Sequence, residues 1–303
     1  YADIDDSSGI DWFSLEVGIT LQGKKLNLLP LLIKYIKQFP GELNLQSLRD
    51  MSDDAVLLPR LEDGRLIPLP IERIRGILET LIELFDDIGL TKEEKLKLPV
   101  TQAIKLAELE AASGNDKLRW LGGEKLRSIG QKLRNFESIS PVQLPHEFNA
   151  ELRTYQQKGL EWLQFLREYN FGGILADDMG LGKTVQTLAH IFVEKTQKRL
   201  TKPALVIAPT SLMANWRMES KQFTPDLKVL TIHGPARKDL FEQIPEHDLV
   251  LTTYPLLSRD QDDLLKHHFH LLILDEAHII KNPKARATQI VHQIQANHRL
   301  CLT

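Results

Sequence analysis

Residues 177–184 read DDMGLGKT, and this stretch stands between a short apolar run and a helical one. The apolar run, 173–176, is typical of a buried strand, and the following residues, 185–194, have the character of a helix. Glycines allow backbone N–H groups to turn towards a phosphate, and a helix N-terminus adds partial positive charge. The sequence therefore predicts a phosphate-binding loop between a strand and a helix.

The residue types of this loop suggest separate chemical roles. We expect Lys183 to reach the outer phosphates of a nucleotide and Thr184 to ligate magnesium. Asp177 stands where the generic pattern has glycine, and the alternative of a glycine-rich turn with an exposed lysine stays open. The residues expected to contact ATP in this loop are Met179, Gly180, Leu181, Gly182, Lys183, Thr184 and Val185.

A second polar motif follows a fully apolar run, 271–274, and reads DEAH at 275–278. An aspartate at the end of a buried strand, beside a phosphate loop, can hold magnesium. The adjacent glutamate can orient and deprotonate a water molecule. We therefore predict that Lys183, Asp275 and Glu276 are catalytic, that Thr184 and Asp275 hold Mg²⁺, and that ATP is the nucleotide. The alternative is a solvated acidic loop.

Six short apolar runs alternate with helical stretches in the second half of the chain. They lie at 173–176, 204–208, 228–232, 249–252, 271–274 and 299–302. This alternation is typical of an α/β fold with a doubly wound parallel sheet. We therefore predict a doubly wound α/β lobe over 151–303, a linker over 137–150 that contains Pro141 and Pro145, and a smaller mixed α+β domain over 1–136.

The first 136 residues show both strand and helix patterns. Residues 12–29 alternate as in a hairpin with a turn at Gln22-Gly23, and a second hairpin is predicted around Asp63-Gly64. Helices are predicted at 31–38, 71–85, 100–112 and 124–136. Basic residues gather between Lys117 and Arg134, either on a helix that faces DNA or braces the lobe, or as an ordinary solvated helix face.

The motifs together resemble helicase superfamily two, and specifically its Swi/Snf-type ATPases. Segments that match further motifs of this family follow in order at 152–163, 206–216, 251–254, 281–283 and 300–303. The resemblance covers residues 145–303. The stretches at 11–13 and 28–32 resemble the N-terminal associated domain of the bacterial branch of this family.

The resemblance implies further roles. Gln156 would read the adenine edge, with Gln157 as a rival, and His278 and Thr303 would couple the nucleotide site to motif III. The residues expected to follow the phosphates of one DNA strand are Pro209, Thr210, Ser211, Thr252, Thr253 and Tyr254, for which turn and cap roles remain the alternative. The implied partners are duplex DNA and a second RecA-like lobe of the same polypeptide.

Composition narrows these hypotheses only slightly. The 303 residues are 42% hydrophobic and 26% charged, with a net charge of −3 and one cysteine, Cys301. No apolar run approaches the roughly 18 residues of a membrane span, and a lone cysteine excludes an internal disulfide. We expect a bacterial cytoplasmic, nucleoid-associated location. Because the sequence stops within the apolar run 300–303, we expect a longer polypeptide.

Two other functions remain open from the sequence. One is a helicase that separates the strands of DNA or RNA. The other is a module that senses nucleotide without turnover. The presence of Lys183, Thr184, Asp275 and Glu276 favours an ATP hydrolase that translocates on duplex DNA and remodels protein–DNA complexes.

Overall fold

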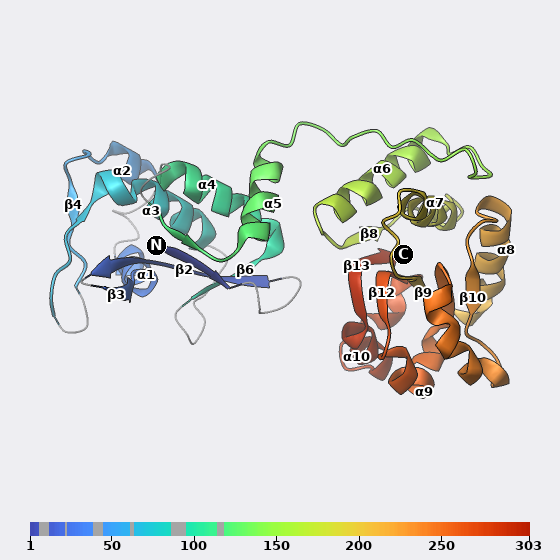
Figure 1. Ribbon diagram of the computed structural model, residues 1–303. Helices are drawn as coiled ribbons and strands as arrows, with labels where there is room; N and C mark the ends of the chain where they lie inside the picture. The colour runs from blue at the N-terminus through green and yellow to red at the C-terminus, as the bar shows by residue number, and fades with distance from the viewer. Residues whose placement is uncertain (6–11, 22, 39–44, 61–63, 86–94, 114–117) are drawn as a thin grey trace. The chain divides into compact units, whose positions relative to one another are not determined.

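The computed structural model of the chain describes residues 1–5, 12–21, 23–38, 45–60, 64–85, 95–113 and 118–303. The chain divides into two compact units, Tyr1–Glu137 and Ser138–Thr303 (Figure 1). No helix in this described part combines the length and the apolar character that a membrane span needs. Four residues used in the sequence predictions lie outside the described ranges: Asp11, Gln22, Asp63 and Lys117.

The first unit has the mixed α+β structure that the sequence predicts. Its strands are β1 (Ala2–Asp5), β2 (Trp12–Leu21), β3 (Lys24–Asn27), β4 (Val56–Leu57), β5 (Leu69–Pro70), β6 (Leu96–Pro99) and β7 (Trp120–Leu121). Its helices are α1 (Leu29–Gln38), α2 (Leu45–Asp50), α3 (Ile71–Phe85), η1 (Val100–Gln102), α4 (Ala103–Ser113) and α5 (Glu124–Arg134). The main sheet has the order β3-β2-β1-β7, with β6 also paired to β2.

Period-two alternation explains why β2 forms the centre of this sheet. Phe13, Leu15 and Val17 are buried in the core of the unit, while the residues between them are at least partly exposed. The predicted hairpin is present as the antiparallel pair β2–β3. Where the second hairpin is predicted, β4 pairs antiparallel with β5, Leu69–Pro70.

The basic residues of α5 do not form one free surface. Lys125, Lys132 and Arg134 are exposed. Arg127, however, forms an ion pair with Glu110 and lies over the ring of Trp120, 4.8 Å from its centroid. Arg127 therefore joins α5 to the rest of the first unit.

The second unit, every residue of which the structure describes, contains the six predicted strands. They are β8 (Gly173–Leu175), β9 (Ala204–Ala208), β10 (Val229–Thr231), β11 (Leu249–Thr253), β12 (His268–Leu274) and β13 (Gln295–Leu302). They form one sheet in the order β10-β11-β9-β12-β13-β8, and all neighbouring strands are parallel. The phosphate loop follows the edge strand, β8.

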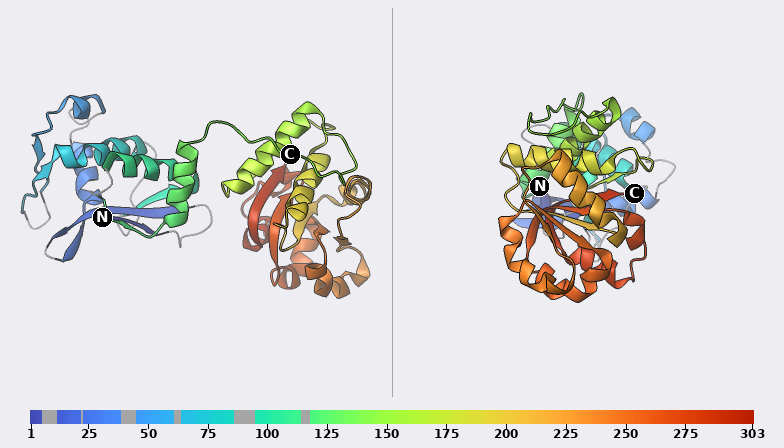
Figure 2. Two further views of the ribbon diagram at one scale, coloured as in Figure 1. Left: turned by 45° about the horizontal axis from the view of Figure 1, so that its top comes forward. Right: turned by 90° about the vertical axis from the view of Figure 1, so that its right-hand side faces the viewer.

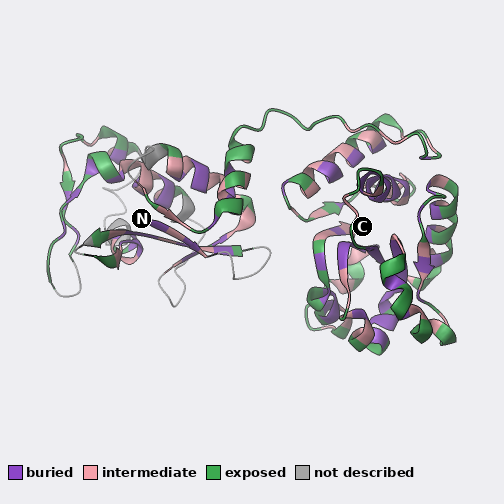
Figure 3. Cartoon of the chain, viewed as in Figure 1, coloured by how far each residue is buried: buried purple, intermediate pink, exposed green. Residues whose placement is uncertain are grey.

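Helices cover both faces of this sheet (Figure 2). They are α6 (Thr154–Glu168), α7 (Lys183–Thr196), η2 (Thr210–Leu212), α8 (Met213–Phe223), η3 (Pro235–Glu246), α9 (Tyr254–Leu264), η4 (Ala277–Ile280) and α10 (Arg286–Gln293). Alternate strand residues belong to two separate cores, with Val206 on the face of α6–α8 and Ile207 on the face of α9 and α10. The central strands are buried on both faces (Figure 3), so the lobe is the predicted doubly wound α/β fold.

The segment 137–150, expected as a linker, has neither helix nor strand, but part of it packs on the second unit. Phe148 is buried, and its ring lies 6.1 Å from that of Phe192 on α7 and 6.5 Å from that of Phe223 at the end of α8. Val142 and Leu144 pack against the same core. The extended connection is therefore confined to residues 137–141, all of which are exposed.

Candidate nucleotide site

The loop between β8 and α7 has the backbone that a phosphate loop requires. Gly180 and Gly182 lie in the left-handed region, with φ values of 85° and 78°. Other residues adopt this region only with strain. Gln186 donates the first backbone bond of α7, to the carbonyl oxygen of Gly182 at 3.2 Å. The N–H groups before Gln186 therefore face out of the helix N-terminus, where they suit an anion.

Lys183 holds a positive charge at this loop. Its Nζ donates to the carbonyl oxygens of Asp177 at 2.5 Å and Asp178 at 3.3 Å. Thr184 is half-buried in the first turn of α7, Val185 is buried, and Met179 is 88% exposed at the tip of the loop.

Helix α6 supports the loop from one side. The side-chain amide of Gln156 and the hydroxyl of Tyr155 both donate to the carbonyl oxygen of Leu181, each at 3.1 Å. Gln156 Oε1 accepts from the backbone N–H of Arg153 at 2.9 Å, which caps α6. Gln156 thus lies at the loop, with both ends of its amide bonded to the chain, whereas Gln157 bonds to the carbonyl oxygen of Val142.

Asp177, which stands where the generic pattern has glycine, has a hydrogen-bond partner that the sequence did not reveal. Gln186, one turn into α7 and fully buried, donates its Nε2 to Asp177 Oδ2 at 2.9 Å. Glycine at position 159 of α6 leaves room for this glutamine in its observed position. A Cβ on Gly159 would lie 1.9 Å from Gln186 Oε1.

The acidic pair lies at the end of β12, at the same sheet edge as the loop. The backbone N–H of Asp275 donates to Ile207 on β9, and that of Thr303 donates to Leu175 on β8. These bonds show that β8, β9, β12 and β13 end together. This edge is where nucleotides bind in open parallel sheets.

The carboxylate of Asp275 is buried and held from several sides. Its Oδ2 accepts from Trp216 Nε1 at 2.8 Å, and its Oδ1 accepts from the backbone N–H of Glu276 at 3.0 Å. Burial raises the pKa of Asp275, while these two bonds and, to a smaller extent, the ammonium group of Lys183 act to lower it.

Glu276 is in the left-handed region with a φ of 51°, a strained position for a residue other than glycine. Its carboxylate lies 3.2 Å from Nδ1 of His278, whose side chain is mostly exposed. Glu276 and His278, both predicted as site residues, are therefore in direct contact at the end of β12.

The residues predicted for nucleic acid fall into two groups. Thr210 and Ser211 are exposed just after β9, and Pro209 is half-buried beside them. The other three, Thr252, Thr253 and Tyr254, are at most 5% exposed. The expectation that their side chains line the surface therefore does not agree with the structure. Thr252 and Thr253 end β11, which is flanked by two strands and covered on both faces, and Tyr254 begins α9 with its side chain in the core.

A buried polar cluster that the sequence did not predict surrounds Glu194 on α7. His270 is buried, and its Nε2 lies 3.1 Å from Glu194 Oε2 in a hydrogen bond. Arg199 donates to Glu194, and Gln164 contacts both Glu194 and His190. Burial acts to raise the pKa of Glu194, but the bonds from His270 and Arg199 hold it well below its usual range.

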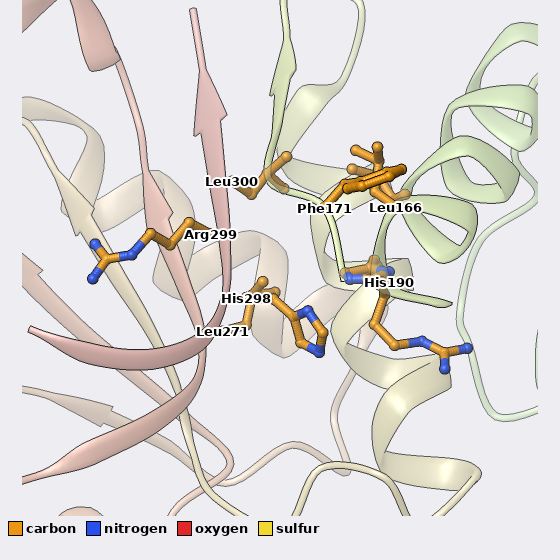
Figure 4. A pocket seen from close by; sticks show the side chains of 9 residues that line it. Leu166, Phe171, His190, Leu271, His298, Arg299 and Leu300 are labelled. Atoms are coloured by element: carbon orange, nitrogen blue, oxygen red, sulfur yellow. The ribbon is translucent and has the colours of Figure 1, made fainter. Parts of the chain in front are cut away.

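The cavity beside this cluster is too small for a nucleotide. It has a volume of about 10 Å³ and is lined by apolar residues together with His190, His298, Arg167 and Arg299 (Figure 4). That volume holds about one water molecule. This cavity therefore differs in kind from the open sheet edge that carries the phosphate loop.

Magnesium suits the partial set of oxygen ligands at that sheet edge. Among the described residues, no group of three or more His, Cys, Asp or Glu side chains could hold a metal ion alone. Proteins usually bind Mg²⁺ through one or two carboxylates together with the phosphates of the substrate. The hydroxyl of Thr184 and the carboxylate of Asp275 supply that kind of incomplete set.

A glycine-rich loop at a helix N-terminus, joined at one sheet edge by a buried aspartate and its neighbouring glutamate, defines the phosphate-loop class of nucleotide-binding ATPase lobes. Comparison with known proteins narrows this class. Residues 155–303 match the SNF2-related domain. The second unit of this chain is therefore an SNF2-related ATPase domain.

Similar proteins come from several kingdoms. The TATA-binding protein-associated factor mot1 of Aspergillus fumigatus is 34% identical over 82% of this chain and 14% of its own length. The YwqA protein of Bacillus subtilis is 38% identical over 59% of this chain and 20% of its own length. The chain thus spans a small part of these relatives.

A solved structure supports the same assignment. The SWI2/SNF2 ATPase core of Sulfolobus solfataricus, in complex with double-stranded DNA, is 38% identical and has a TM-score of 0.51. The match covers 54% of this chain and 34% of that one.

Proposed function

We propose that this chain supplies the first nucleotide-binding lobe of a DNA-dependent ATPase that translocates on duplex DNA and remodels protein–DNA complexes. The observation that carries the proposal is the meeting of the phosphate loop and the Asp275-Glu276 pair at one sheet edge. The similarity to an ATPase core solved with double-stranded DNA favours duplex DNA as the partner.

The proposed roles follow from the positions of the side chains. Lys183 and the N–H groups at the start of α7 bind the phosphates, with Met179–Val185 as the loop around them. Thr184 and Asp275 hold magnesium, which would neutralise charge on the phosphates. Glu276 orients and deprotonates the attacking water. Gln156, at the other side of the loop, contacts the adenine.

For nucleic acid, we propose contacts through Pro209, Thr210 and Ser211, whose exposed edge suits phosphate groups. The buried Thr252, Thr253 and Tyr254 support this surface from within the lobe. Two further residues couple the nucleotide site to the motif at 300–303. They are His278, which is exposed and paired with Glu276, and Thr303, which follows β13.

We also propose that the chain belongs to the bacterial branch of the family and acts in the cytoplasm at the nucleoid. The Bacillus subtilis relative supports this assignment, while the fungal relative matches a larger share of the chain. The first unit would then be the N-terminal associated domain of that branch.

The test is the ATPase rate of the protein extended through its second lobe, measured without nucleic acid and with duplex DNA, single-stranded DNA or RNA. We expect the largest stimulation by duplex DNA and no strand displacement. Stimulation by RNA or single strands alone, or efficient strand displacement, would favour a strand-separating helicase. Nucleotide binding without turnover under every condition would indicate a sensing module.

A further inference from the structure

The side chain and the main chain of Asp275 are both held by aromatic residues from distant parts of the chain. Trp216 lies on α8 and donates its indole N–H to Asp275 Oδ2 at 2.8 Å. Tyr254 lies at the start of α9 and donates its hydroxyl to the carbonyl oxygen of Asp275, also at 2.8 Å. Both bonds are buried.

Neither aromatic side chain can easily move. Trp216 is fully buried in the core between α6–α8 and the sheet, and Tyr254 is 5% exposed in the core on the opposite face. Closely packed interiors keep such side chains in one orientation. The indole N–H is therefore a fixed donor, and it restrains the rotation of the carboxylate about its χ angles.

The restrained carboxylate keeps room for a cation. An ionised carboxylate offers about four lone-pair sites. Two of the sites on Asp275 are used by Trp216 and the N–H of Glu276, which leaves one on each oxygen. The free site on each oxygen can accept a cation.

We propose that Trp216 and Tyr254 are positioning residues that together fix the orientation in which Asp275 meets magnesium. The proposal rests on the proposed nucleotide site. Trp216 follows the exposed Thr210-Ser211 surface by one turn and a half of helix, and Tyr254 follows Thr252-Thr253 directly. A displacement of either segment would therefore turn the carboxylate that faces the metal.

Nucleotide binding tests the proposal without turnover. In one titration, a fluorescent ADP analogue is added to residues 1–303 in EDTA. In a separate titration without EDTA, Mg²⁺ is added at fixed nucleotide. Trp216→Phe keeps an aromatic ring but removes the donor. A hydrogen bond to a charged group contributes about 1.5–3 kcal/mol, which corresponds to roughly 10-fold or more. We expect the half-saturating Mg²⁺ concentration to rise by about this factor, with affinity in EDTA unchanged.

Tyr254→Phe gives a second variant that removes only a hydroxyl group, and it should raise the same Mg²⁺ concentration by a smaller factor. Trp162→Phe, on α6, is the matched control and should leave both titrations unchanged. Equal Mg²⁺ dependence in wild type and both variants would overturn the proposal. So would equal losses of affinity with and without Mg²⁺, because they indicate a purely structural role.

A spectroscopic readout keeps the proposal testable if Trp216→Phe does not fold. Replacing Trp12, Trp120 and Trp162 by phenylalanine leaves Trp216 as the sole tryptophan of the four. Its emission should change when Mg²⁺ is added to the nucleotide complex and not when nucleotide is added in EDTA. Unchanged emission contradicts the positioning role. If wild type binds nucleotide with no Mg²⁺ dependence, the proposed site itself fails.

Discussion

Lys183 is the residue for which the structure most directly predicts the effect of a substitution. Its ammonium group is the charge held at the phosphate loop, against the carbonyl oxygens of Asp177 and Asp178. Lys183→Ala should weaken ATP binding by roughly 10- to 100-fold, the value of one or two hydrogen bonds to a charged group. The measurement is equilibrium binding of a fluorescent nucleotide. Lys202→Ala, an exposed lysine just before β9, serves as the control, and equal affinity in all three proteins would contradict the site.

Glu276 should affect turnover and not binding. Glutamine keeps the size of the side chain but is a poor base, so Glu276→Gln should retain Mg-ATP affinity while hydrolysis falls by roughly 10²–10⁴. Single-turnover hydrolysis and nucleotide affinity, measured on a chain extended through the proposed second lobe, separate the two effects. Glu246→Gln, exposed at the end of η3, should behave as wild type. Normal hydrolysis by Glu276→Gln would mean that another residue activates the water.

Gly159 illustrates a constraint between two helices. Because a Cβ there would lie 1.9 Å from Gln186 Oε1, and Gln186 is fully buried, Gly159→Ala should lower the free energy of unfolding by about 1–3 kcal/mol. Lys158→Ala, on the exposed side of α6, should have little effect. Chemical denaturation measures both. In a Gly159→Ala, Gln186→Ala double variant the clash is absent, so additive losses would show that the contact is not the cause.

Single residues also show where sequence reasoning stops. The loop glycines, Lys183 and Asp275 could be found because each belongs to a short motif with fixed spacing. The bond between Trp216 and Asp275 joins residues 59 positions apart, and no local pattern reports it. Thr252, Thr253 and Tyr254 matched a motif, but a motif does not show which way a side chain faces.

The buried cluster around Glu194 contains side chains from α6, α7, β12 and β13. Its histidines make the free energy of unfolding depend on pH. Burial lowers the pKa of His190 and His298 to about 4. The folded chain binds these protons less readily than the unfolded chain does. The contribution of the two neutral histidines to the free energy of unfolding is therefore fully present above about pH 6.5 and is lost as the pH falls towards 4. For the buried His190, the effect is about 3 kcal/mol.

Unfolding by urea at pH 7, 6 and 5 measures this loss. His298→Leu removes one of the titrating groups and should reduce the slope of stability against pH, whereas His233→Asn, at an exposed position, should leave the slope unchanged. An identical slope in His298→Leu and wild type would contradict the assignment. Protonation of Glu194, whose pKa is lowered, adds to the loss at still lower pH.

The six strands of the second unit could be predicted because each is a local apolar run followed by a helical period. Helix α3 could be predicted over the same residues, 71–85, for the same reason. The order of the strands, the partner of β4 and the cluster around Glu194 depend on contacts between distant residues. The packing of Phe148 was missed because two prolines and polar neighbours are typical of a linker.

For the whole molecule, we expect residues 1–303 to bind Mg-ATP weakly and to hydrolyse it very slowly. The family resemblance implies a second lobe that brings arginines to the outer phosphate, and loss of such an arginine costs roughly 10³–10⁵ in rate. Steady-state ATPase assays of residues 1–303 and of an extended chain, with and without duplex DNA, make the comparison. DNA-stimulated turnover should require the extension. Robust stimulated turnover by residues 1–303 alone would contradict the need for two lobes.

The ring of Phe148 has a mechanical consequence. It connects the segment that arrives from the first unit to α7, which begins at Lys183, and to the end of α8, which carries Trp216. A pulling force applied through the first unit would therefore meet this core first at Val142 and Leu144, and then reach the two helices that hold the phosphate loop and Asp275 through Phe148. Replacing Phe148 by alanine would remove the contact of its ring with both helices and leave Val142 and Leu144 as the attachment of the arriving segment.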